Sequence, residues 1–146
     1  MSEILIVFGT ESGNSEMAAD DIAACLGRRG ITAEIKSMED VSVAGLKLTS
    51  QLVVVTSTYG AGELPETTAP FFEALVEKAP DLSSVNFFAF GLGDSTYEKF
   101  NNAIDVISAK LVELGAIKIG ETGRHDAASG KSVTMVANAW FEQVYN

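Results

Sequence analysis

A dense group of hydrogen-bond donors follows the first apolar segment of the chain. Residues 9–15 read Gly-Thr-Glu-Ser-Gly-Asn-Ser and stand directly before a helical pattern. Free backbone N–H groups and the helix dipole favour an anion at such a position. Ser12 or Asn14 could instead simply cap the helix. The density of neutral donors favours a phosphate site, and the chain lacks the Gly-x-x-x-x-Gly-Lys and Gly-x-Gly-x-x-Gly motifs of nucleotide hydrolysis and dinucleotide binding.

Two further loops each carry a tyrosine among small residues. Tyr59 lies in the sequence Ser-Thr-Tyr-Gly-Ala-Gly at 57–62, and Tyr97 ends Gly-Leu-Gly-Asp-Ser-Thr-Tyr at 91–97. Either ring alone could simply pack on its own loop. Two rings on opposite sides of one cleft would hold a flat aromatic ligand by stacking. Beside a phosphate loop, the pair favours such a ligand.

The segments around these loops alternate between two patterns. Apolar runs at 4–8, 52–55 and 85–92 predict strands buried on both faces, and the more polar segments 32–37 and 116–121 predict edge strands. Apolar residues at helical spacing predict helices over 18–29, 70–79, 103–114 and 133–144, whereas 38–50 is ambiguous and compatible with a short helix at 41–48.

This alternation predicts an α/β fold in which helices cover both faces of a five-stranded parallel sheet. Such three-layer sandwiches bind ligands beyond the carboxyl ends of their strands. The donor-rich loop and the two tyrosine loops follow the first, third and fourth predicted strands. We therefore expect all three loops to meet at one edge of the sheet.

Composition limits the remaining possibilities. The chain has 146 residues, a formal net charge of -10, one cysteine and one histidine. That length predicts a single domain over 1–146, and one cysteine allows no internal disulfide. The negative charge argues against nucleic acid and anionic membranes as partners and favours basic ones. No secretory signal or membrane-spanning run is found, so we expect a cytoplasmic protein.

Taken together, the three loops resemble those of flavodoxins of the short-chain type. The motifs are Thr10-x-Ser12-Gly13-x-Ser15, Ser57-Thr58-Tyr59-Gly60-x-Gly62 and Gly91-Leu92-Gly93-Asp94-Ser95-Thr96-Tyr97-Glu98-x-Phe100. The second and third are similar to the FMN domains of diflavin reductases and to small bacterial MioC-like flavodoxins. The resemblance implies a flavodoxin-like sandwich with strand order 2-1-3-4-5 and FMN as cofactor.

The resemblance also assigns roles to individual residues. It places the FMN phosphate on the first loop, the isoalloxazine ring beside the second, and the pyrimidine edge on backbone groups of the third, with Tyr97 on the outer face of the ring. The implied cofactor-binding residues are Thr10, Glu11, Ser12, Gly13, Asn14, Ser15, Ser57, Thr58, Tyr59, Gly60, Leu92, Gly93, Asp94, Tyr97, Phe100 and Asn101. No catalytic residue and no metal ligand is expected.

The implied function is that of a monomeric, low-potential carrier of single electrons rather than a stand-alone enzyme. Its donor would be an NADPH-dependent flavoprotein reductase, and its acceptors would be redox enzymes with basic docking patches. Acidic residues in the ligand loops would disfavour added negative charge on the flavin. A receiver-type signalling module is disfavoured because Thr56-Ser57-Thr58 stands where its phosphorylated Asp belongs, and a low-molecular-weight phosphatase because the first loop has no Cys or Arg. A third possibility stays open: a protein, with or without bound FMN, that assists another pathway by interacting with its proteins.

Overall fold

A parallel sheet forms the centre of the computed structural model, which describes residues 4–9, 14–58, 64–96 and 101–145. Its strands are β1 (Ile4–Gly9), β2 (Ala33–Ser37), β3 (Gln51–Ser57), β4 (Asn86–Gly93), β5 (Ile117–Lys118) and β6 (Gly123–Asp126). They are arranged in the order β2-β1-β3-β4-β5, and β6 also pairs with β4. The predicted parallel sheet with order 2-1-3-4-5 is confirmed.

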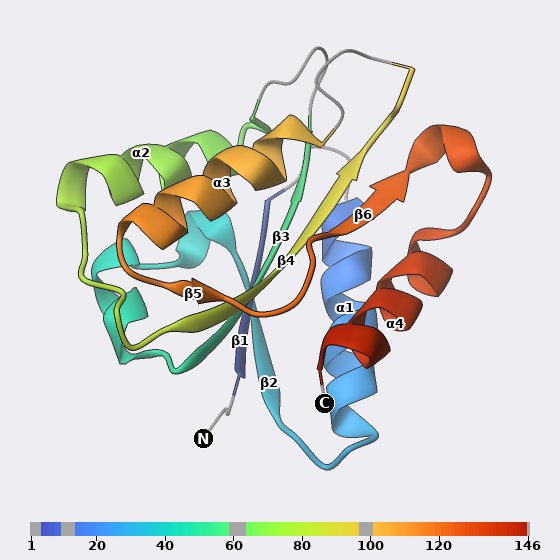
Figure 1. Ribbon diagram of the computed structural model, residues 1–146, viewed down its shortest axis with the longest axis horizontal. Helices are drawn as coiled ribbons and strands as arrows, with labels where there is room; N and C mark the ends of the chain where they lie inside the picture. The colour runs from blue at the N-terminus through green and yellow to red at the C-terminus, as the bar shows by residue number, and fades with distance from the viewer. Residues whose placement is uncertain (1–3, 10–13, 59–63, 97–100, 146) are drawn as a thin grey trace.

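Helices cover both faces of this sheet, as predicted (Figure 1). Helices α1 (Asn14–Gly27) and α4 (Val133–Val144) pack on one face, and α2 (Thr68–Lys78) and α3 (Asn102–Glu113) pack on the other. Short 3₁₀ helices at Met38–Asp40 and Val43–Leu48 fill the ambiguous segment. None of the helices in the described ranges is long and apolar enough to cross a membrane.

Alternate residues of the central strands supply two separate hydrophobic cores. Ile4, Ile6, Val53 and Val55 face α1 and α4, together with Phe88 and Phe90. Val7, Leu52, Val54, Phe87 and Ala89 face α2 and α3. Burial on both faces explains why these strands read as continuous apolar runs rather than as alternating ones.

The edge strand differs from the prediction. The segment expected as one strand over 116–121 is only the short β5, which pairs with the start of β4 from Asn86. After Gly120, whose φ is +71°, the chain continues in the same direction as β6, which pairs in parallel with the end of β4 from Phe90 to Gly93. His125 lies in β6, with its Nε2 2.8 Å from the Lys131 carbonyl oxygen.

One row of small residues crosses the sheet near its carboxyl edge. Gly9 pairs with Thr56, which pairs with Gly91. A Cβ on Gly9 would lie 1.9 Å from Thr68 Oγ1, and one on Gly91 would lie 2.4 Å from Ile104 Cγ2. The two glycines therefore let the first turns of α2 and α3 approach the sheet closely. A buried hydrogen bond of 2.7 Å joins the hydroxyls of Thr56 and Thr68 at the same place.

Gly123 makes a similar close contact on the opposite face. A Cβ there would lie 2.4 Å from Phe90 Cδ1 and 2.6 Å from the Trp140 ring. The indole cannot easily give way, because its Nε1 donates to the Glu121 carbonyl over 2.8 Å. The position where β6 begins is thus fixed by packing against two aromatic side chains.

We expect Gly123→Ala to lower the free energy of unfolding by about 1–3 kcal/mol, the usual cost of adding a methyl group to a filled core. Urea unfolding followed by circular dichroism measures the change. Gly27→Ala is the matched control, because nothing lies within 4 Å of its Cβ and it ends a helix; it should be neutral or slightly stabilising. Equal effects of the two substitutions would contradict the packing argument.

Candidate functional site

The carboxyl ends of four neighbouring strands form one edge of the sheet. Ser57 at the end of β3 pairs with Leu92 of β4, and Leu92 pairs with His125 of β6. Gly93 pairs with Asp126 in the next row. Because β1 ends one row earlier, at Gly9 beside Thr56, the segments that follow all four strands start within a short distance of one another. This is where the sequence places its ligand loops.

The predicted site residues fall into two groups. Thr10, Glu11, Ser12, Gly13, Tyr59, Gly60, Tyr97 and Phe100 lie outside the described residues, so their roles stay predictions. The described members are Asn14, Ser15, Ser57, Thr58, Leu92, Gly93, Asp94 and Asn101. The structure brings Ser57, Thr58, Leu92, Gly93 and Asp94 together at the ends of β3 and β4.

Ser15 occupies the second position of α1 and is fully buried. Its hydroxyl has no hydrogen-bond partner among the described residues. A buried hydroxyl without a partner costs folding free energy. Because Ser15 lies at a helix N-terminus, where anions bind favourably, its hydroxyl is suited to donate a hydrogen bond to an anion there. Neutral donors of this kind fit a phosphate monoester that is held rather than cleaved.

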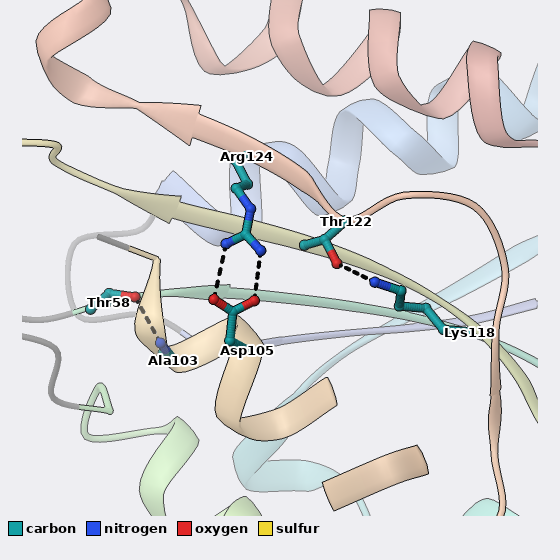
Figure 2. Close-up of polar contacts among 6 residues, drawn as sticks. All are labelled: Thr58, Ala103, Asp105, Lys118, Thr122 and Arg124. Atoms are coloured by element: carbon teal, nitrogen blue, oxygen red, sulfur yellow. Dashed lines mark hydrogen bonds and ion pairs between the residues drawn. The ribbon is translucent and has the colours of Figure 1, made fainter. Parts of the chain in front are cut away.

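Thr58 joins the second loop to the third. Its backbone N–H donates to the Leu92 carbonyl over 2.9 Å, and its hydroxyl accepts from the N–H of Ala103 over 3.0 Å (Figure 2). The N-cap residue of α3, Asn101, makes no such side-chain bond to its own helix. Thr58 therefore caps α3 from another loop, which gives its hydroxyl a partner that the sequence did not reveal.

Asn101 adopts a left-handed backbone conformation, with φ at 57°, and is fully buried. Both polar atoms of its amide lack partners in the described part of the chain. A Cβ added to Gly91 would lie 3.1 Å from Asn101 Oδ1, so the amide lies against the backbone of β4. Asn101 thus carries unused hydrogen-bonding capacity at the same edge of the sheet as Ser15.

Two carboxylates shape the start of the third loop. Asp94 Oδ1 accepts from the backbone N–H of Thr96 over 2.9 Å and from its hydroxyl over 2.6 Å. Asp126 Oδ1 accepts from the backbone N–H groups of Ser95 and Ala128, both over 2.9 Å. Hydrogen bonds from the side chain and backbone of Ser95 hold the pKa of Asp126 below its usual range, so this carboxylate is ionised at neutral pH.

Asp126 and Ala103 were not among the predicted site residues. The signal for Asp126 was available, because an aspartate that ends a strand at the ligand edge can accept backbone N–H groups from a neighbouring loop. No local signal marks Ala103, which takes part through its backbone alone.

The described part of the ligand edge offers several kinds of polar group. The described residues hold no group of three or more His, Cys, Asp or Glu side chains placed to bind a metal. Cys25, the only cysteine, is buried in α1 within the hydrophobic core. What the described residues offer at this edge is hydroxyl, amide, carboxylate and backbone groups.

We expect Thr58→Val to lower the free energy of unfolding by about 1 kcal/mol, because it keeps the side-chain shape but removes the acceptor that caps α3. Thr122→Val is the matched control: its hydroxyl accepts from the exposed Lys118 Nζ over 2.9 Å, and its loss should change stability by less than about 0.5 kcal/mol. Urea unfolding of both variants measures the difference. A Thr58→Val protein as stable as the control would contradict the capping role.

Comparison with known proteins gives a consistent result. The family model described as Flavodoxin matches residues 6–140. Protein MioC of Escherichia coli (strain K12) is 39% identical over 125 residues, covering 84% of this chain and 82% of that protein. NADPH-dependent diflavin oxidoreductase 1 of Emericella nidulans is 36% identical over 137 residues, which cover 90% of this chain but only 21% of that protein.

Solved structures agree with this assignment. Oxidised Flavodoxin 2 from Bacillus cereus superposes with a TM-score of 0.84 at 28% identity, covering 95% of this chain and 94% of that one. Flavodoxin from Streptococcus pneumoniae TIGR4 gives 0.83 at 28% identity, covering 97% and 96%. Proteins of the flavodoxin family bind FMN. With the family model matching most of its length and the parallel sheet and strand order in agreement, this chain belongs to the flavodoxin family.

Proposed function

We propose that this chain is a single-domain FMN protein that carries single electrons at low potential, as a monomer of the cytoplasm and not as a stand-alone enzyme. The observation that carries the proposal is the convergence of unpartnered and neutral polar groups at one edge of a flavodoxin sheet, where the first, second and third loops begin. Its donor would be an NADPH-dependent flavoprotein reductase, and its acceptors would be redox enzymes with basic docking patches.

The described residues fit the cofactor in their chemistry. Ser15 and the first N–H groups of α1, which opens at Asn14, would hold the phosphate, because they combine free donors with the positive end of a helix dipole. Ser57 and Thr58 would line one side of the ring, and Leu92, Gly93 and Asp94 would present backbone groups to its polar edge. When bound, FMN supplies reversible one-electron transfer, and the protein tunes it.

The remaining predicted contacts complete this picture. Thr10 to Gly13 would add donors to the phosphate, and Tyr59 and Tyr97 would stack on the two faces of the ring. Aromatic rings stacked on the flavin would exclude water from it and strengthen the electrostatic effects of the protein on it. Phe100 and Asn101 would support the polar edge of the ring.

The charge of the chain supports both the low potential and the choice of partners. With a net charge of -10, the protein disfavours a further negative charge on the bound ring. Asp94 and Asp126 lie at the ligand edge itself. The same field would steer basic partners toward that edge and weaken with added salt.

The relatives support a donor of the diflavin type. In the relative named NADPH-dependent diflavin oxidoreductase 1, the match to this chain covers about a fifth of the protein. Electrons from the proposed reductase would reach this domain through a small, transient interface. The relative named Protein MioC leaves open a dedicated role in one pathway.

Titration of the cofactor-free protein tests the proposal. We expect it to bind one FMN per chain, to turn yellow, and to bind riboflavin, which lacks the phosphate, much more weakly. Ser15→Ala should weaken FMN binding about tenfold, as expected for the loss of one hydrogen bond to a charged group, while leaving riboflavin binding unchanged. Flavin fluorescence quenching measures both affinities.

Ser108→Ala provides the matched control. Ser108 also has a buried hydroxyl without a partner among the described residues, but it lies in the second half of α3. Its loss should leave FMN affinity unchanged. A colourless protein that takes up no FMN would overturn the proposed function, and equal losses in the two variants would overturn the role of Ser15.

A further inference from the structure

Strand β6 makes hydrogen bonds to the chain on both sides of residues 97–100, at Ser95 before them and at Asp105 of α3 after them. Arg124 and Asp126 are two residues apart on this strand, so their side chains project from the same face of the sheet. That face carries α3, because Arg124 pairs with Gly91, whose close neighbour is Ile104. The two side chains reach the chain before and after the predicted ring-stacking Tyr97.

Arg124 holds the segment after the loop. Its guanidinium donates to both carboxylate oxygens of Asp105, over 2.7 and 3.2 Å (Figure 2). This paired geometry fixes orientation as well as distance. Asp105 lies in the first turn of α3, so the bond fixes the start of that helix relative to β6.

Asp126 holds the segment before the loop. Its Oδ1 accepts from the N–H of Ser95, which follows β4 by two residues, and the same oxygen accepts from Ala128. His125 directly precedes Asp126 on the strand and points to the other face of the sheet. It is buried, and its Nε2 makes a hydrogen bond with the Lys131 carbonyl. The backbone that carries Asp126 is therefore itself fixed on both sides of the strand.

These two links fix Ser95 and Asp105, the described residues on either side of the loop that the sequence assigns to the ring. Restraining a loop in its bound conformation improves affinity by reducing the entropy lost on binding. Both members of the Arg124–Asp105 pair are more than one-third exposed, so the pair adds little to global stability. Its effect should therefore be visible in binding rather than in unfolding.

We propose that Arg124 and Asp126 are positioning residues, which act through Asp105 and Ser95 to hold the third loop for FMN. We call these two residues with their partners the β6 clamp. The inference rests on the proposed function, because it names what sets the affinity of that same site.

The test compares two clamp variants with two matched controls in the full chain. Arg124→Met breaks the pair with Asp105, whereas Lys110→Met breaks the Lys110–Glu113 pair on the same helix. Asp126→Ala removes the acceptor of Ser95, whereas Asp81→Ala removes an equivalent acceptor of the Ser83 N–H, 3.1 Å away, before β4 begins. Each clamp variant should raise the Kd for FMN about tenfold, the loss of about 1.4 kcal/mol. Each control should change it less than twofold.

Two further readouts separate positioning from mere destabilisation. Hydrogen exchange of the Ser95 amide in the cofactor-free protein should become faster in Asp126→Ala and not in Asp81→Ala, while urea unfolding changes little in either. The double variant Arg124→Asp with Asp105→Arg restores opposite charges and should recover most of the lost affinity.

The outcomes are distinguishable. If the unaltered chain takes up no FMN, the proposed function fails. If it binds FMN but the clamp variants and their controls bind equally well, or if Ser95 exchange is unchanged in cofactor-free Asp126→Ala, the β6 clamp is overturned. A loss of affinity that simply follows the loss of unfolding free energy in all four variants would overturn it as well.

Discussion

The parallel register of four strands is the constraint on which the site depends. Gly9, Thr56, Gly91 and Arg124 form one continuous row across β1, β3, β4 and β6. The two glycines of this row allow the first turns of α2 and α3 to pack closely against the sheet. The ligand loops follow directly after this row. A shift of one residue would turn every buried side chain of a strand to the opposite face. The cores on both faces therefore fix where the ligand loops start.

Hydrogen bonds between distant segments then hold these loops relative to one another. Thr58 ties the second loop to α3, and Asp126 ties the third loop to β6. Ser15 and Asn101 are two of the buried polar residues that have side-chain atoms without partners among the described residues, and both lie at this edge of the sheet. Bonds between segments combined with unpartnered polar groups are the pattern expected for the preorganised binding site that we propose.

The sequence predicts the central part of this structure well and its edge poorly. The buried strands β1, β3 and β4 produce apolar runs that can be recognised in the sequence itself. The sequence does not reveal that the edge strand is split into two. Both residues of β5 are exposed, and β6 alternates between buried and less buried residues, so neither strand produces a continuous apolar run. Bonds such as Thr58 to Ala103 join residues 45 positions apart and depend on tertiary packing. The roles of Tyr59 and Tyr97 stay predictions.

An anaerobic redox titration of the FMN-loaded protein shows whether it transfers electrons in single steps, as we propose. We expect two separate one-electron steps, with the second at low potential. Because the chain carries a net charge of -10, that second potential should rise as salt screens the charge. A single two-electron step with no dependence on salt would overturn the proposed electron transfer.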